Sequence, residues 1–165
     1  INTSYRDDDY VDMLLYNGIL GGFPHSKLFQ NVREKASLAY YAFSRLEKHK
    51  GIQLIGSGIE AENYERALEI IQEQVEELKK GNITHEEMEY TKRGLISQYS
   101  IIGDSPYSLV SFFLDGLISQ RETDVEYFIG RIQDIKEADV IEASRKVCLD
   151  TIYFLCPEDR KGGIQ

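Results

Sequence analysis

Residues 17–46 carry the pattern of a helix that runs into Gly21-Gly22, a short loop, a second helix and then a strand. A glycine pair of this kind ends a helix, because glycine adopts the left-handed backbone conformation that other residues avoid. Arg33 lies near the end of the second helix, and Tyr40 follows seven residues later, just inside the strand. This order predicts that a guanidinium and a phenol come together at one edge of a sheet.

A β-hairpin is predicted around a short polar turn. Residues 38–46 and 52–59 are rich in aromatic and branched side chains, and KHKG lies between them. Gly56 and Gly58 inside the second strand indicate that another group packs closely on that face. The apolar run TIYFLC at 151–156 predicts a third strand.

A block of helices follows the hairpin. Residues 61–80 carry apolar side chains at the three-four spacing of one buried helix face. Thr84 with Glu87, and Thr123 with Glu126, have the spacing of capping boxes, in which two side chains bind free backbone N–H groups at a helix start. Further helices are therefore predicted to begin at both threonines.

Two more helices complete the block. One is predicted to open at Pro106 and carries the large apolar side chains Leu109, Phe112, Phe113 and Leu117. The other is expected from Glu137 to Cys148. Because the helices follow the hairpin instead of alternating with strands, the pattern indicates an α+β fold. Three strands make a thin sheet for so many helices, so we expect a further strand upstream of Ile1.

Size and charge narrow the class of protein. The length of 165 residues predicts one domain over residues 1–165. The 28 acidic and 19 basic side chains give a net charge of −9, which disfavours nucleic acid, because phosphates require a basic face. No apolar run approaches the roughly 18 residues of a membrane-spanning helix, so no membrane partner is expected. Cys148 and Cys156 are expected to be buried reduced thiols, which favours a cytoplasmic location.

Two local patterns resemble catalytic motifs but lack required residues. HEEME at 85–89 has one histidine, whereas a zinc-binding helix needs H-E-x-x-H or H-x-x-E-H to place two histidines on one face. The sequence has only His25, His49 and His85, and no two of them have helical metal-ligand spacing. GGFPHSK lacks the second glycine of a phosphate-binding loop. We therefore expect no metal or cofactor site in this chain.

Arg33 and Tyr40 are the candidate site residues. In one interpretation Arg33 pairs with Glu34 or with an acid from another helix, while Tyr40 packs in the sheet. In the other interpretation the pair binds a peptide carbonyl, or the oxyanion that it becomes, through charged and phenolic donors. Composition and spacing leave both interpretations open.

The run LGG…SKLFQNVREKASLAY resembles the second-half domain of the insulinase/pitrilysin family of zinc peptidases, which includes mitochondrial processing peptidase. The shared pattern is a glycine pair after a helix, a Ser-x-Leu-Phe helix, an Arg-Glu pair and a tyrosine seven residues after the arginine. In this sequence these are Gly21-Gly22, Ser26-Lys27-Leu28-Phe29, Arg33-Glu34 and Tyr40. The likeness continues through the hairpin, SGIEAENYERAL, GNIT and the terminal strand, so it covers nearly the whole chain.

The resemblance implies a domain of the processing-peptidase type, with a mostly antiparallel sheet that helices cover on one side and a first strand that is missing here. In such peptidases the first copy of the domain holds zinc through H-x-x-E-H, and the second copy lacks the metal. This chain is then expected to be the C-terminal, non-zinc-binding lobe of a bacterial metallopeptidase. By motif position, Arg33 and Tyr40 would bind the backbone of a peptide substrate.

The same resemblance implies partners. Zinc is expected on an N-terminal lobe or a partner subunit, so the chain alone should not hydrolyse peptides. A homodimer that lends the missing strand is a further expectation. The alternative is a non-catalytic scaffold of the same fold, as in core subunits of respiratory complexes.

Overall fold

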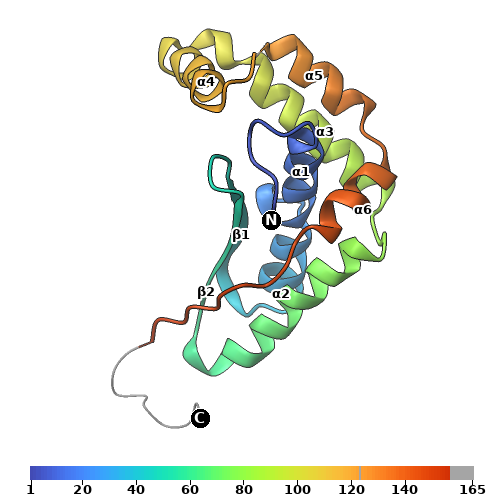
Figure 1. The fold of residues 1–165 in the computed structure, drawn as a ribbon. Helices are drawn as coiled ribbons and strands as arrows, with labels where there is room; N and C mark the ends of the chain where they lie inside the picture. The colour runs from blue at the N-terminus through green and yellow to red at the C-terminus, as the bar shows by residue number, and fades with distance from the viewer. Residues whose placement is uncertain (123, 157–165) are drawn as a thin grey trace.

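The computed structural model describes residues 1–122 and 124–156 and confirms a helix-rich α+β fold (Figure 1). The elements follow in the order α1 (Tyr10–Asn17), the π-helices η1 (Gly18–Gly22) and η2 (Phe29–Lys35), β1 (Ala39–Glu47), β2 (Ile52–Ile59), the 3-10 turn η3 (Ala61–Asn63), α2 (Tyr64–Lys79), α3 (His85–Ser100), the 3-10 turn η4 (Ile102–Asp104), α4 (Pro106–Ser119), α5 (Val125–Asp134) and α6 (Glu137–Arg145). Strands β1 and β2 form the predicted antiparallel hairpin. Helix α1 and the two π-helices pack against β1.

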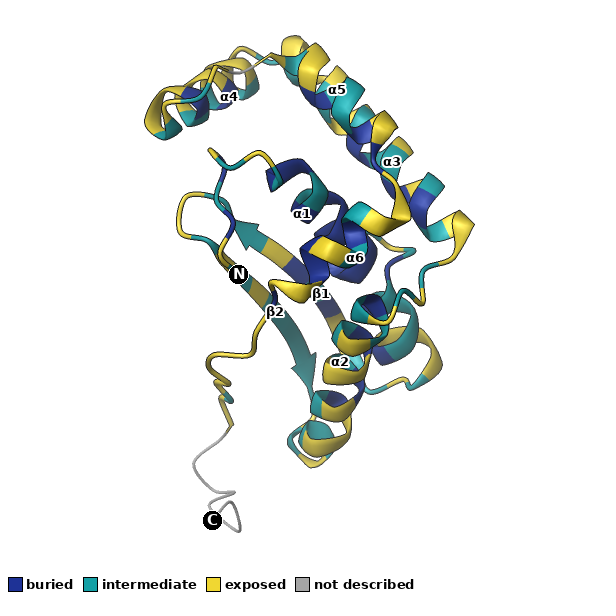
Figure 2. Cartoon of the chain, turned by 45° about the vertical axis from the view of Figure 1, so that its right-hand side comes forward, coloured by how far each residue is buried: buried dark blue, intermediate teal, exposed yellow. Residues whose placement is uncertain are grey.

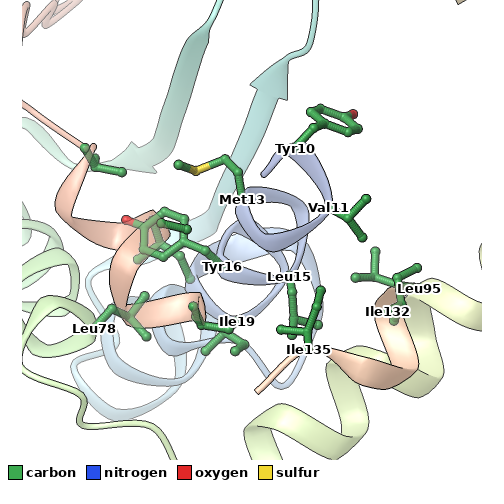
Figure 3. Packing of buried hydrophobic residues seen from close by; sticks show 14 of the residues in the cluster. Tyr10, Val11, Met13, Leu15, Tyr16, Ile19, Leu78, Leu95, Ile132 and Ile135 are labelled. Carbon is green, nitrogen blue, oxygen red and sulfur yellow. The ribbon is translucent and has the colours of Figure 1, made fainter. Parts of the chain in front are cut away.

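Helix α1 is the centre of the core. A helix that is apolar on nearly every side must be buried, and α1 packs against α5 and α6 on one side and β1 on another. Figure 3 shows buried side chains of α1 and of the segments that pack around it: Tyr10, Val11, Met13, Leu15, Tyr16, Ile19, Leu78, Leu95, Ile132 and Ile135. These contacts join residues from both ends of the chain.

A buried polar cluster ties the end of α1 to the hairpin. Ser44 Oγ in β1 lies 2.7 Å from Asn17 Oδ1 and 3.1 Å from the Asn17 carbonyl oxygen. Gln53 Nε2 in β2 donates to the same Asn17 Oδ1 at 3.2 Å. A buried polar group that lost its partner would cost about 1–3 kcal/mol, so this cluster specifies how the hairpin sits on α1.

The helix predicted over 61–80 is confirmed as η3 and α2, with Ala67 and Leu78 among its buried residues. The capping box of α3 is also confirmed: Glu87 N donates to Thr84 Oγ1 at 3.1 Å, and Thr84 N donates to Glu87 Oε2 at 2.8 Å. The other proposed box involves Thr123, which lies outside the described residues.

The third strand predicted at 151–156 is wrong: in the described part of the chain, only β1 and β2 form a sheet. A strand exists only where its backbone N–H and C=O groups pair with a neighbour, and no strand of the described residues pairs with this segment. Phe154 anchors the segment instead, through a ring contact of 4.4 Å with Tyr64. Residues 1–6 likewise form no strand, although Tyr5 N donates to Lys48 O at 2.7 Å.

Helix α4 begins at Pro106 as predicted, but most of its large apolar side chains are exposed. Phe112 is buried at 6% exposure, but Phe113 and Leu117 are 53% and 76% exposed, and Leu109 is 36% exposed. The physical reason is that α4 bends away from the α3 segment by 109° and packs mainly on η4 at one end of the molecule (Figure 2). Within the described residues, no single helix has the length and apolar composition to cross a membrane. The α3–η4 segment and α4 meet those criteria only when they are counted together.

The two cysteines are exposed, which corrects the expectation of buried thiols. Cys148 lies beyond the end of α6, and Cys156 lies in the segment without a sheet partner.

Candidate functional site

The site is built where η1 and η2 meet β1. Gly21 makes this approach close: a Cβ at this position would lie 2.9 Å from both Leu28 Cδ1 and the carbonyl carbon of Phe43. Contacts of that length force neighbouring atoms to move, so glycine lets the helical segment lie directly on the strand. Leu28 and Val32 are fully buried beneath η2. The outer side of η2 then lies beside the start of β1.

Arg33 lies on this outer side and is exposed. Its guanidinium carbon lies 4.5 Å from the centre of the Phe29 ring, a cation–π contact. Its Nε lies 3.7 Å from Glu34 Oε1, which is an ion pair without a hydrogen bond. The expected pairing of Arg33 with Glu34 is therefore present, but it is weak and exposed.

Tyr40 does not pack in the sheet. In the hairpin register Ala39 pairs with Ile59 and Tyr41 pairs with Gly58, so Tyr40 is the extra residue of a β-bulge. The bulge turns its side chain outward, where it is 73% exposed. Bulges commonly re-aim a side chain next to a functional site.

The Tyr40 hydroxyl donates a hydrogen bond of 2.8 Å to Glu60 Oε1. This hydrogen bond, together with the negative charge of Glu60, raises the pKa of Tyr40, because both favour the neutral phenol. Glu60 follows β2 directly and was not singled out by the sequence analysis. Because β2 pairs with β1, the residue that follows β2 lies near the start of β1, and this position could have identified Glu60 as a site residue.

Arg33, Tyr40 and Glu60 line one open pocket of about 390 Å³. The other lining residues come from η2, from the segment before β1, from the first residue of β1 and from η3, namely Glu34, Ser37, Leu38, Ala39 and Asn63. Ser37 has a positive φ of 52°, which is uncommon for a residue other than glycine and bends the chain between Arg33 and Tyr40. Arg33 and Tyr40 thus line the same pocket. The pocket can bind groups that need hydrogen-bond donors and acceptors side by side.

Metal binding finds no support in the described residues, where no group of three or more His, Cys, Asp or Glu side chains could hold an ion. His85 is exposed at the first position of α3. His25 stacks on Phe23, and its Nε2 lies 3.0 Å from Thr91 Oγ1. Burial lowers the pKa of His25, which favours the neutral ring.

A second polar cluster joins the hairpin turn to α4. His49 Nε2 lies 2.9 Å from Asp115 Oδ1, and Ser119 Oγ lies 3.2 Å from His49 Nδ1. Lys48 forms an ion pair with the other oxygen of Asp115. These partners are 66 to 70 residues apart in sequence, so no local pattern predicted them.

Comparisons with known proteins agree on one family. The family model "Peptidase M16 inactive domain" matches residues 1–95. The chain is 43% identical over 154 residues to the "Probable inactive metalloprotease YmfF" of Bacillus subtilis (strain 168), covering 93% of this chain and 36% of that protein. It is 33% identical over 102 residues to the "Uncharacterized zinc protease YmxG" of the same organism, covering 61% of this chain and 25% of that protein.

Two solved structures show the same fold. A conserved protein from Enterococcus faecalis V583 has a TM-score of 0.81 and 36% identity, over 87% of this chain and 34% of its own. The peptidase M16 inactive domain from Pseudomonas fluorescens has a TM-score of 0.75 and 25% identity, over 89% of this chain and 36% of its own. The chain therefore spans roughly a third of the length of these proteins.

Proposed function

The chain belongs to the peptidase M16 inactive-domain family, and on this premise we propose that it is the substrate-binding part of a zinc-dependent metallopeptidase. The membership confirms the resemblance to a zinc-peptidase domain that lacks the metal. The more specific part of the proposal is that Arg33 and Tyr40 bind the peptide, and the geometry of their shared pocket supports it.

The observation that carries the proposal is the shared pocket of Arg33 and Tyr40. A guanidinium has five N–H donors in a planar fork, and a phenol both donates and accepts. Both side chains are exposed, and each is steered toward the pocket by the local backbone: η2 for Arg33 and the bulge for Tyr40. Such groups suit the carbonyl and N–H groups of a peptide backbone.

The zinc ion would be held by another lobe or subunit. The absence of a metal-binding group from residues 1–122 and 124–156 supports this division, as does the name "zinc protease" of a relative that is longer than this chain. The exposed apolar side chains of α4 also support a protein partner, because soluble proteins seldom leave such a surface uncovered. Elemental analysis of the purified chain should find no stoichiometric zinc, and one tightly bound zinc per chain would contradict the division.

The test is a substitution in the complete two-lobe protein. Arg33→Ala should lower kcat/KM for peptide hydrolysis by about 10²–10³, the loss expected when an oxyanion-type donor is removed. Arg45→Ala is the matched control, because Arg45 is an exposed arginine on β1 outside the pocket, paired with Glu47. Equal values of kcat/KM in the two variants would contradict a role of Arg33 in substrate binding.

A non-catalytic scaffold is the second candidate function. The relative with 43% identity is named a probable inactive metalloprotease, which favours this alternative. The discriminating observation is whether the complete protein, or a partner chain, carries H-x-x-E-H. If neither does, the scaffold function is supported and the peptidase proposal fails.

Three further expectations stay predictions: a single domain over residues 1–165, a cytoplasmic location and a homodimer. The exposure of Cys148 and Cys156 removes one argument for the location, which rested on buried thiols.

A further inference from the structure

The direction of the Tyr40 hydrogen bond limits what Tyr40 can offer a ligand. A phenol has one proton, and that of Tyr40 is donated to Glu60 Oε1. The phenol oxygen keeps its lone pairs and can still accept a hydrogen bond. While the bond to Glu60 is in place, Tyr40 therefore meets a ligand in the pocket as an acceptor.

Backbone structure holds both partners of this bond. Tyr40 is aimed by the bulge between Ala39 and Tyr41. Glu60 is fixed by the turn that follows β2, where Asn63 N donates to the Glu60 carbonyl oxygen at 3.0 Å. The backbone of both Tyr40 and Glu60 is thus held in place, although the Tyr40 side chain is exposed.

Arg33 supplies the complementary chemistry. Phe29 supports its guanidinium from one face, and within the described residues it donates no hydrogen bond. Its donors therefore stay open to the pocket. A peptide backbone presents carbonyl acceptors and N–H donors, which match the donors of Arg33 and the acceptor oxygen of Tyr40.

We propose that Glu60 is a positioning residue of the peptide site: it takes the Tyr40 proton, so that the Tyr40 oxygen accepts a peptide N–H while Arg33 donates to a peptide carbonyl. This inference rests on the proposed function, because it assigns the direction of the hydrogen bonds in the same pocket. It adds Glu60 to the site and assigns Tyr40 the role of an acceptor.

The first test is spectroscopic and needs no peptide. The tyrosinate absorbance of Tyr40 is obtained by subtracting the titration of Tyr40→Phe, in the complete protein. The pKa of Tyr40 should be above the ordinary tyrosine value in the unmodified protein and should fall toward that value in Glu60→Ala. Glu65→Ala, which removes an exposed carboxylate from α2, should leave it unchanged. An unchanged titration in Glu60→Ala would overturn the positioning contact.

The second test is a double-mutant cycle on peptide binding, measured by the fluorescence anisotropy of a fluorescein-labelled, unstructured peptide of alanine and serine. Glu60→Ala should weaken binding about threefold to tenfold, the worth of one hydrogen bond in water. Glu60→Gln should restore most of the affinity, because the amide oxygen still accepts the phenol proton. In Tyr40→Phe, the further change Glu60→Ala should have no effect. Equal weakening in both backgrounds would show that Glu60 acts without Tyr40 and would overturn the proposal.

The direction of the bond is tested by replacing each backbone N–H of the peptide with an ester oxygen in turn. One ester position should weaken binding to the unmodified protein and leave binding to Tyr40→Phe unchanged. If no position depends on Tyr40, the acceptor role is wrong.

The two proposals fail in distinguishable ways. If Arg33→Ala and Tyr40→Phe both leave peptide binding unchanged, the proposed function fails, whatever the titration shows. If these two variants weaken binding and Glu60→Ala does not, only the role of Glu60 fails.

Discussion

The pocket wall and helix α4 expose opposite kinds of side chain. The pocket wall, which we define as η2, the start of β1 and Glu60, exposes polar and aromatic groups that contact one another, as in Tyr40 with Glu60 and Arg33 with Phe29. Helix α4 exposes apolar groups such as Phe113 and Leu117, and most of its large side chains lie in the open. The pocket wall rests on the buried core, whereas α4 lies at the end of the molecule (Figure 2).

The exposed polar residues of the pocket wall and the exposed apolar residues of α4 therefore have different explanations. Contacts within this chain account for the position of each polar group in the pocket wall. Phe112 of α4 packs on Phe128, but most of the apolar side chains of α4 stay exposed within the described residues, which agrees with the protein partner proposed above. Apolar content alone therefore does not tell where the core lies.

The largest effect is expected from two neighbouring phenylalanines of α4. Phe112 is buried against Phe128, with ring centres 5.8 Å apart, whereas Phe113 is 53% exposed. Phe112→Ala should lower the free energy of unfolding by about 3–5 kcal/mol, because a large buried side chain is lost. Phe113→Ala should lower it by only about 1 kcal/mol, because Phe113 loses an edge contact with the Phe112 ring, with ring centres 5.6 Å apart.

Urea unfolding of the two variants measures this contrast directly. Similar losses of unfolding free energy for both phenylalanines would mean that both sides of α4 are covered within this chain. The contrast drawn between α4 and the pocket wall would then be wrong.

A smaller effect is expected from two glycines that adjoin these regions, Gly21 in η1 and Gly103 in η4. Gly21→Ala places a methyl group against the backbone of β1 and should destabilise the chain by about 1–3 kcal/mol. Gly103→Ala in η4 is the matched control, because no atom lies within 4 Å of the position that its Cβ would take. Thermal unfolding should separate the two variants. A Gly103 variant as unstable as the Gly21 variant would contradict the close packing of η1 on β1, which supports the pocket wall.

The sequence predicted the parts of the fold that depend on local periodicity. The helix over 61–80, the hairpin and the Thr84 capping box all follow from residues a few positions apart, and all are present. The third strand failed for a physical reason, because a strand-like sequence needs a neighbour before it becomes a strand. Which side chains of α4 meet the core was not predicted, because a bend of 109° between the α3 segment and α4 decides it, and the pattern of residues does not show that bend.

The candidate site was predicted in part. Arg33 and Tyr40 were chosen as candidate site residues from the spacing of the motif, and both line one pocket in the structure. The bulge at Tyr40 and its bond to Glu60 were not predicted, because they depend on the register of two strands and join residues 20 positions apart. Their functional roles stay predictions.

The most direct test of the central claim asks which of the two regions a substrate touches. A peptide that carries a benzophenone group is photo-crosslinked to the complete two-lobe protein, and the attachment sites are mapped by mass spectrometry. Our account predicts attachment at the pocket wall, around residues 33–40 and Glu60, and loss of this attachment when unlabelled peptide competes. Attachment on α4, with none at the pocket wall, would contradict it.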